Sequence, residues 1–508
     1  MNLEEKAPFL PTPWRRLMLI IMTLLVSVIM GQALLSSWSE PQVASRLELY
    51  QTDLLLQATE WEGGDFAPEQ VALLRQNLLG EQPLSKAQEA YVTVRETATK
   101  TLELADSGDQ TVASDRRVQA AYAQQAELLD LLDLRLGILQ AEQGETEAAI
   151  AAWQQVQSRH SQGSALWATA QNLSNLWQGE SANAASEPLL SETLNGWFRN
   201  RALTQLYTQT DQANALDQLY LAEQQRAETT LATLALIGVV PVIGCVLGIA
   251  LLLGLLWQRF QQGSASLLAQ GGQRWETPWT GETIWQVLVA GFLFLGQFIV
   301  PLLISPLGGV LNGFGSRGQA LYALLYYVLM AAGAIAVLAI SIRPFRPLSA
   351  DWFTFKLRSK SWLWGVGGYF VALPLMLAVS FVNQQIWQGQ GGSNPLLQTV
   401  LEAQDPITLG LFFFTAAVAA PLFEELLFRG FLLPSLTRYL PVWGAISLSS
   451  FIFAAAHLSL SEVLPLMVLG MVLGAVYTRS RNLVAPMVLH SAWNSITMLG
   501  LFLLGSAA

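Results

Sequence analysis

The sequence is poor in charge and in cysteine, and each shortage excludes a class of protein. Only 13% of the 508 residues are charged, whereas 52% are hydrophobic. A soluble enzyme carries about 25% charged residues, so we expect a polytopic membrane protein. The one cysteine, Cys245, excludes an intramolecular disulfide. The chain also lacks the motifs G-x-S-x-G and H-E-x-x-H. Their absence argues against a serine hydrolase of the first type and a zinc protease of the second.

Acidic residues are concentrated in one segment. Residues 40–228 carry 27 acidic and 12 basic side chains, whereas the rest of the chain is net positive. This segment has low hydropathy and is rich in Gln, Ala, Leu and Glu, which favours helices. We predict an all-helical soluble domain at 39–229. Its acidity argues against nucleic acid as a partner, since phosphates need a basic surface.

Two parts of this domain have small and large residues spaced as in helix-turn-helix repeats. They are Leu136, Gly137, Gly144, Ala148, Ala149 and Trp153, and Trp197, Phe198, Ala202, Leu206 and Tyr207. The spacing is similar to degenerate tetratricopeptide (TPR) repeats, with an irregular helical bundle as the alternative. Either architecture favours binding of a protein partner. His160, in the polar stretch SRHSQG, is interpreted as a solvated loop residue.

Nine apolar segments are predicted to cross a lipid bilayer. They are 17–38, 231–257, 284–305, 321–342, 361–383, 407–428, 442–458, 463–478 and 484–505. The expected fold is all-α and polytopic, with about nine transmembrane helices and the soluble domain inserted between the first and second. The expected parts are a cytoplasmic N-terminus (1–16), an uncleaved anchor (17–38), the helical domain (39–229), transmembrane helices 2–4 (230–355) and a C-terminal core (356–508).

Basic residues predict the orientation of these spans. Arg15 and Arg16 precede the first span, and the loop 384–406 has no Lys or Arg. The positive-inside rule therefore places the N-terminus in the cytoplasm and residues 39–229 outside it. A plasma membrane and a thylakoid-type inner membrane would give the same hydropathy profile.

Three polar patterns interrupt the C-terminal spans. The first is PLFEELLFRG, which holds Glu424, Glu425 and Arg429. An ionised carboxylate at bilayer depth costs a few kcal/mol or more unless it is satisfied, so these residues indicate a functional site. The i,i+4 spacing pairs Glu425 with Arg429 on one helix face and leaves Glu424 without a local partner.

The second pattern holds Phe453 and His457, and the third holds His490 and Asn494. In each, the two residues are four apart and so share a helix face. Counted from a turn near Leu440, Glu424 and His457 lie at nearly equal heights and can meet. His490 follows Arg481 by nine residues, on the order of 13 Å, and is expected to be shallower, so that helix tilt or an open cytoplasmic cavity must make up the difference.

A carboxylate and an imidazole in a desolvated site suit general-base activation of water. His490 and the Asn494 amide can donate hydrogen bonds to the oxyanion of a tetrahedral intermediate. The set therefore predicts amide hydrolysis. Glu424, His457 and His490 also form the donor set of some catalytic zinc sites, so the sequence leaves a divalent metal such as zinc open.

The motifs E-E-x-x-x-R (Glu424 to Arg429), F-x-x-x-H (Phe453 to His457) and H-x-x-x-N (His490 to Asn494) resemble those of the CPBP, or Abi, intramembrane proteases. This family includes the type II CAAX prenyl endopeptidases and bacteriocin-processing or self-immunity proteins. The resemblance covers about 360–505 and implies a membrane-embedded helical core with a cavity open to the cytoplasm.

The resemblance also implies roles for the matching residues. Glu424 would activate water with the help of His457, and His490 with Asn494 would stabilise the oxyanion. Glu425, Arg429 and Phe453 would support them. Members are called metalloproteases, although the glutamate-dependent mechanism needs no metal ligand set. The acidic domain is not part of the family's core pattern.

The leading interpretation is an intramembrane endopeptidase that cleaves membrane-associated proteins or peptides. The alternative is a non-catalytic membrane scaffold or immunity factor, whose function survives loss of Glu424 but not deletion of 40–228. A proton-relaying transporter ranks third, because the sequence has no inverted internal repeat.

Overall fold

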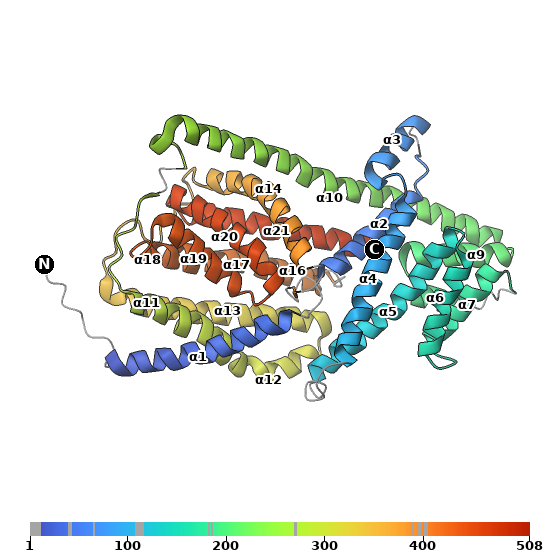
Figure 1. Ribbon diagram of the computed structural model, residues 1–508, viewed down its shortest axis with the longest axis horizontal. Helices are drawn as coiled ribbons and strands as arrows, with labels where there is room; N and C mark the ends of the chain where they lie inside the picture. Colours follow the sequence, from blue (N-terminus) through green and yellow to red (C-terminus); the bar gives the residue numbers. More distant parts are fainter. Residues whose placement is uncertain are drawn as a thin grey trace. The chain divides into compact units, whose positions relative to one another are not determined.

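The computed structural model describes residues 12–38, 43–64, 67–106, 116–180, 183, 186–268, 272–387, 391–393, 399–400 and 405–507. These residues are helical with short connections, and no β-strand occurs among them (Figure 1). The chain forms two compact units. We call them the membrane unit (Met1–Gln42 and Pro241–Phe502) and the helical unit (Val43–Val240 and Leu503–Ala508).

Among the described residues, eight helical segments are long and apolar enough to cross a membrane, and a ninth apolar helix is shorter. The eight are Pro13–Ser37, Ala213–Gln262, Gly281–Leu311, Gly315–Phe345, Trp362–Trp387, Pro406–Leu436, Leu460–Ser480 and Val484–Gly505, and the ninth is Val442–Ala455. Each predicted apolar segment corresponds to one of them. The prediction of an all-α, polytopic membrane protein is therefore confirmed.

The membrane unit is built from helices that include three π-helical stretches. Its helices are α1 (Thr12–Ser37), the second half of α10 (Ala213–Gln262), α11 (Gly281–Trp285), η4 (Gln286–Ile299), α12 (Val300–Asn312), α13 (Gly315–Ile342), α14 (Trp362–Trp387), α16 (Pro406–Phe414), η6 (Thr415–Ala419), α17 (Ala420–Glu424), η7 (Glu425–Leu432), α18 (Leu433–Leu436), α19 (Val442–Ala455), α20 (Leu460–Ser480) and α21 (Val484–Ala507). The stretches η4, η6 and η7 are π-helices.

The segment before α11, residues 272–280, is hydrogen-bonded to the end of α18 and to the turn that follows it. The backbone N–H of Trp275 donates to Thr437 Oγ1 (3.1 Å), and the Trp279 indole donates to Ser435 Oγ (2.9 Å). Arg438 donates in return to the backbone oxygen of Trp279 (2.9 Å). Both tryptophans are buried. These contacts fix the end of the helical run that carries the first polar motif.

The helical unit contains α2 to α9 and the first half of α10. Their bounds are Val43–Thr59 (α2), Pro68–Leu79 (α3), Pro83–Asp106 (α4), Arg116–Glu142 (α5), Thr146–Arg159 (α6), Ala165–Gln178 (α7), Glu187–Thr193 (α8) and Gly196–Gln209 (α9).

The first repeat-like stretch of the sequence is a helical hairpin of α5 and α6. Gly144 turns the chain with a φ of 84°, which a glycine adopts without strain. Trp153 packs against Gly137, where a Cβ would lie 2.3 Å from the indole nitrogen, and that nitrogen donates to Leu134 O (3.1 Å). The small and large residues are thus explained by packing, and the TPR resemblance stays a prediction.

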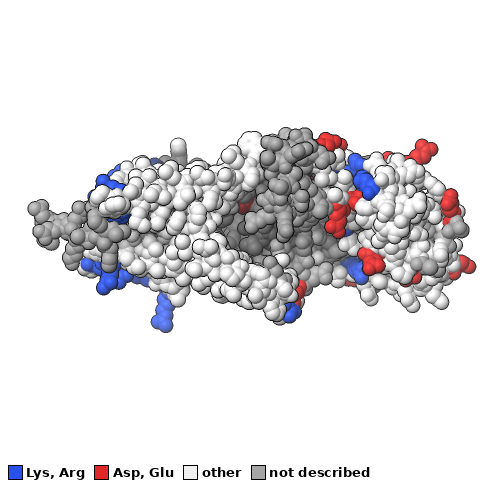
Figure 2. Space-filling view, turned by 90° about the horizontal axis from the view of Figure 1, so that it is seen from below, with Lys and Arg blue, Asp and Glu red and all other residues white. Residues whose placement is uncertain are grey.

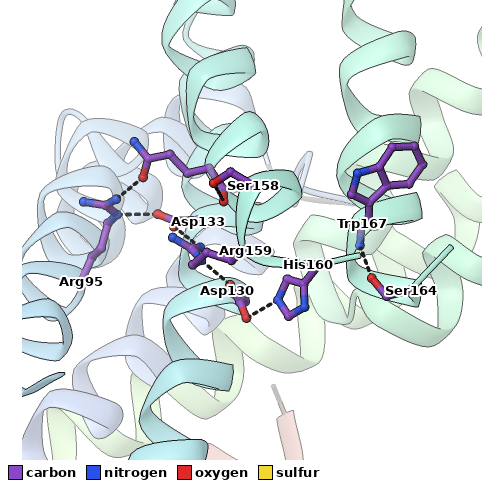
Figure 3. Close-up of polar contacts among 9 residues, drawn as sticks. Arg95, Asp130, Asp133, Ser158, Arg159, His160, Ser164 and Trp167 are labelled. Atoms are coloured by element: carbon purple, nitrogen blue, oxygen red, sulfur yellow. Dashed lines mark hydrogen bonds and ion pairs between the residues drawn. The ribbon is translucent and has the colours of Figure 1, made fainter. Parts of the chain in front are cut away.

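His160 lies in the loop after α6, as the sequence predicts, but it is only partly solvated. Its side chain is 28% exposed, and its Nε2 lies 2.6 Å from Asp130 Oδ2 (Figure 3). Arg159 donates to Asp130 Oδ1 (2.7 Å), and both Arg159 and Arg95 pair with Asp133. The network ties α4, α5 and α6 together. The sequence did not reveal this partner because Asp130 lies thirty residues earlier in the chain.

Glu142, at the end of α5, gives the helical unit a testable pH dependence. Burial raises its pKa; Arg201 opposes this, and the carboxylates of Glu60 and Glu223 add to it. A raised folded-state pKa means that the group contributes stability below its unfolded pKa and loses it as pH rises through the folded pKa. Glu142→Gln should therefore slow hydrogen exchange of the α5 amides about twofold at neutral pH, and leave it unchanged near pH 4.

The matched control is Glu127→Gln, which makes the same change at an exposed position in the middle of α5. It should leave exchange unaltered at both pH values. Equal exchange in Glu142→Gln and the wild type at neutral pH would show that this carboxylate does not oppose folding.

Candidate functional site

The first motif lies at the junction of an α-helix and a π-helix. The segments α16, η6, α17, η7 and α18 run on from one another, with Glu424 closing α17 and Glu425 opening η7. Short π-helical insertions shift the helical register and often occur at functional sites. Here the change of register falls between the two carboxylates.

Glu425 and Arg429 form the buried ion pair that their spacing predicts. Arg429 Nη1 lies 2.9 Å from Glu425 Oε1, and their side chains are 1% and 0% exposed. Arg429 also donates from Nη2 to Gly470 O (3.2 Å), and its guanidinium lies 4.5 Å from the centre of the Phe453 ring. A Cβ on Gly470 would lie 2.9 Å from Ser450 Cβ, so glycine permits this close packing. Removing one charge would leave the other buried without its ion-pair partner.

His490 lies between the two carboxylates. Its Nδ1 is 2.8 Å from Glu425 Oε1, and its Nε2 is 3.9 Å from Glu424 Oε2. Because Glu425 Oε1 also accepts from Arg429, we assign Nδ1 as the donor. The Nε2 atom then faces Glu424.

Counted along the chain, His490 is shallower than Glu424, and the structure nevertheless brings the two side chains to 3.9 Å. The count treats Arg481 as the exposed end of the helix. In the structure the turn that follows is buried: Leu483 is 1% exposed, and its N–H donates to Thr354 O (2.9 Å). The count from the turn near Leu440 also assumed an α-helix. The π-helix η7 lies between Glu424 and that turn and advances less per residue, so Glu424 lies closer to the turn than the count predicts.

Glu424 has a partner that the motifs did not include. The Tyr327 hydroxyl, from α13, donates to Glu424 Oε1 at 3.0 Å. The Glu424 side chain is 14% exposed, in contrast to the fully buried Glu425. No sequence signal singles out Tyr327, because Tyr322 and Tyr326 lie in the same apolar run.

His457 lies just past the end of its helix. Helix α19 ends at Ala455, and Leu458 has a φ of 59°, which turns the chain toward α20. The His457 Nδ1 is still 2.8 Å from Phe453 O, and the ring packs edge-on against the Phe453 ring (4.9 Å). Since a carbonyl only accepts, Nδ1 donates and Nε2 is left as an acceptor in the neutral ring.

Phe453 connects the two histidines. Its ring centre is 4.9 Å from that of His457 and 6.0 Å from that of His490. The described side chains of Glu424 and His457 share no hydrogen bond or ion pair. The structure therefore brings Glu424, Glu425, Arg429 and His490 into contact and places His457 beside them through Phe453.

Asn494 and Ser491 are anchored by the π-helix η6. Asn494 Nδ2 donates to Ala416 O, and Ser491 Oγ donates to Ala417 O, each at 2.7 Å. Pro421 has no N–H, so the carbonyls one turn before it lose a backbone donor. The two side chains of α21 replace that donor. Pro421 was the sequence signal for this contact, and motif reasoning missed it.

The residues of this site do not fit a metal as they are placed. No group of three His, Cys, Asp or Glu side chains within the described parts of the chain could hold a metal ion. Of the three predicted donors, Glu424 and His490 approach each other, whereas among the described contacts none joins the His457 side chain to either of them. The chemistry below therefore uses the side chains alone.

Comparison with known proteins identifies the region that contains this site. Residues 406–496 match the family model described as type II CAAX prenyl endopeptidase Rce1-like. The chain is 23% identical over 224 residues to the membrane-embedded CAAX protease MroQ of Staphylococcus aureus, which covers 42% of this chain and 89% of MroQ. It is also 23% identical over 137 residues to the "putative membrane peptidase" YdiL of Bacillus subtilis. That match covers 27% of this chain and 55% of YdiL. The search of solved structures gave no significant match.

The matched region holds all three motifs, from Glu424 to Asn494. The family and both relatives support a membrane protease. The C-terminal part of this chain, residues 406–496, thus holds a domain similar to the Rce1-like type II CAAX prenyl endopeptidases.

Proposed function

We propose that this protein is an intramembrane endopeptidase that hydrolyses peptide bonds in membrane-associated proteins or peptides. One observation carries the proposal: Glu424 lies 3.9 Å from His490 beside the buried Glu425–Arg429 pair. A carboxylate among membrane helices is costly unless the fold satisfies it. Glu424 is the carboxylate that keeps partial exposure and is not neutralised by an arginine.

In the proposed mechanism Glu424 is the general base. Its Oε2 takes a proton from water, and the resulting hydroxide attacks the carbonyl carbon of the scissile peptide bond. The tetrahedral intermediate breaks down when Glu424 passes that proton to the leaving amine. His457 assists by accepting a hydrogen bond from the same water at Nε2, since its Nδ1 is held by Phe453 O.

His490 and Asn494 are the proposed oxyanion donors. Asn494 uses one amide hydrogen for Ala416 O, which leaves the other to donate. The His490 Nδ1 already donates to Glu425, so Nε2 donates only when the ring is an imidazolium.

The proposed setting is a bilayer, with the N-terminus in the cytoplasm. Figure 2 shows an uncharged surface across the middle of the membrane unit, with Lys and Arg gathered toward one end. An apolar band with basic residues at one edge is typical of a membrane protein oriented by the positive-inside rule. We further propose that the helical unit lies outside the cytoplasm and binds a protein partner.

The substrate class can be tested with two matched peptides. MroQ is named a CAAX protease, so we propose that prenylated C-terminal peptides are substrates. The full-length protein in liposomes should cleave a farnesylated CAAX peptide, and mass spectrometry should find the shortened product. Equal cleavage of the unprenylated peptide would support an endopeptidase of broader specificity. If neither peptide is cut by folded protein, CAAX-type processing is excluded.

A further inference from the structure

The hydrogen bond from Tyr327 gives the two oxygens of Glu424 different environments. Oε1 accepts from the Tyr327 hydroxyl at 3.0 Å, whereas Oε2 faces His490 Nε2 at 3.9 Å. The described residues offer the Tyr327 hydroxyl no other acceptor. Tyr327 lies on α13, outside the region 406–496 that matches the protease family.

The packing of α13 holds this tyrosine in place. Its ring packs edge-on against Phe423, which precedes Glu424 and is 4% exposed. Two glycines bring α13 close to η4: a Cβ on Gly291 would lie 2.9 Å from Val337, and one on Gly333 would lie 2.6 Å from Leu295. A helix fixed this closely can hold the hydroxyl at a constant distance from the carboxylate.

We propose that Tyr327 is a positioning residue for Glu424. By holding Oε1, it prevents rotation of the carboxylate and leaves Oε2 directed toward the reacting water and His490. The inference rests on the proposed function, because it assigns Tyr327 to the same catalytic step.

The neighbouring Tyr326 provides a matched control. Its hydroxyl donates to the backbone oxygen of Gly296 (3.2 Å) and not to Glu424. Tyr327→Phe and Tyr326→Phe each remove one hydroxyl from adjacent residues of α13 and keep the ring. Any difference between them therefore reports the bond to Glu424 and not a general change in α13.

The first measurement is turnover of the farnesylated CAAX peptide. Tyr327→Phe should lower kcat about 10- to 100-fold, the effect of losing a hydrogen bond to a charged group, with KM nearly unchanged. Tyr326→Phe should match the wild type in both kcat and KM.

The second measurement does not depend on a substrate. Dicyclohexylcarbodiimide modifies protonated carboxyl groups within membranes, and mass spectrometry can locate the adduct on Glu424. In Tyr327→Phe, Glu424 should be labelled faster at a given pH than in the wild type and in Tyr326→Phe, because its Oε1 has lost the hydroxyl bonded to it. The same rate of labelling in all three proteins would overturn the proposal for Tyr327.

The two measurements also separate this inference from the proposed function. If Tyr327→Phe alters labelling but Glu424→Gln cleaves as well as the wild type, Tyr327 positions a carboxylate that is not the base, and the proposed function fails. If Glu424→Gln is inactive but Tyr327→Phe matches Tyr326→Phe in both assays, only the role of Tyr327 fails.

Discussion

Replacing Glu424 by glutamine is expected to lower kcat by about 10²- to 10⁴-fold, the usual contribution of a general base. Glutamine keeps the size of the side chain and can still accept from Tyr327, but it cannot take a proton from water. The fold should be unaffected, because Glu424 is partly exposed and makes no ion pair with an arginine. The measurement is peptide cleavage by the reconstituted protein, with the unfolding temperature as a check on folding.

A control variant should behave differently. Glu276→Gln makes the same chemical change at an exposed position in the segment before α11. It should cleave at the wild-type rate. A Glu424→Gln protein that retains more than a tenth of the wild-type kcat would contradict the assignment of Glu424 as the base.

Replacing Arg429 by methionine should cause the largest loss of stability in the membrane unit. It leaves Glu425 fully buried, with His490 as its remaining partner; Oε2 of Glu425 already has no hydrogen bond. Breaking a buried ion pair by removing one partner costs about 3–5 kcal/mol. We expect little folded Arg429→Met protein, as measured by size-exclusion chromatography in detergent and by the unfolding temperature.

The double variant Glu425→Gln/Arg429→Met tests the cause. It removes both charges, and replacing a whole buried pair by neutral groups is much less costly than breaking it. The double variant should therefore recover much of the folded protein lost in Arg429→Met. If Arg429→Met is as stable as the wild type, the pair does not hold the site together.

Much of the fold and part of the site could be predicted from the sequence. Apolar runs of bilayer length indicate spans directly, because the membrane imposes a minimum length. The Glu425–Arg429 pair followed from helical spacing, which depends only on local geometry. The order of the three motifs also located the region that matches the protease family.

The rest of the site depends on contacts that spacing does not encode. His490 reaches Glu424 because a distant segment buries the turn at Leu483, which makes distance from Arg481 a poor measure of depth. His457 leaves its helix because Leu458 adopts a left-handed backbone conformation. Tyr327 lies on a separate helix, α13. Its sequence surroundings do not distinguish it from Tyr322 and Tyr326 in the same apolar run.

The most direct test of the central claim is a comparison in cells. A strain lacking this protein is complemented with the wild type or with Glu424→Gln at equal abundance, and the N-termini and C-termini of its membrane proteins are mapped by mass spectrometry. We predict that Glu424→Gln leaves at least one membrane protein uncleaved that the wild type processes. Identical termini in the two strains, with the deletion phenotype corrected by both, would contradict a protease and favour a scaffold.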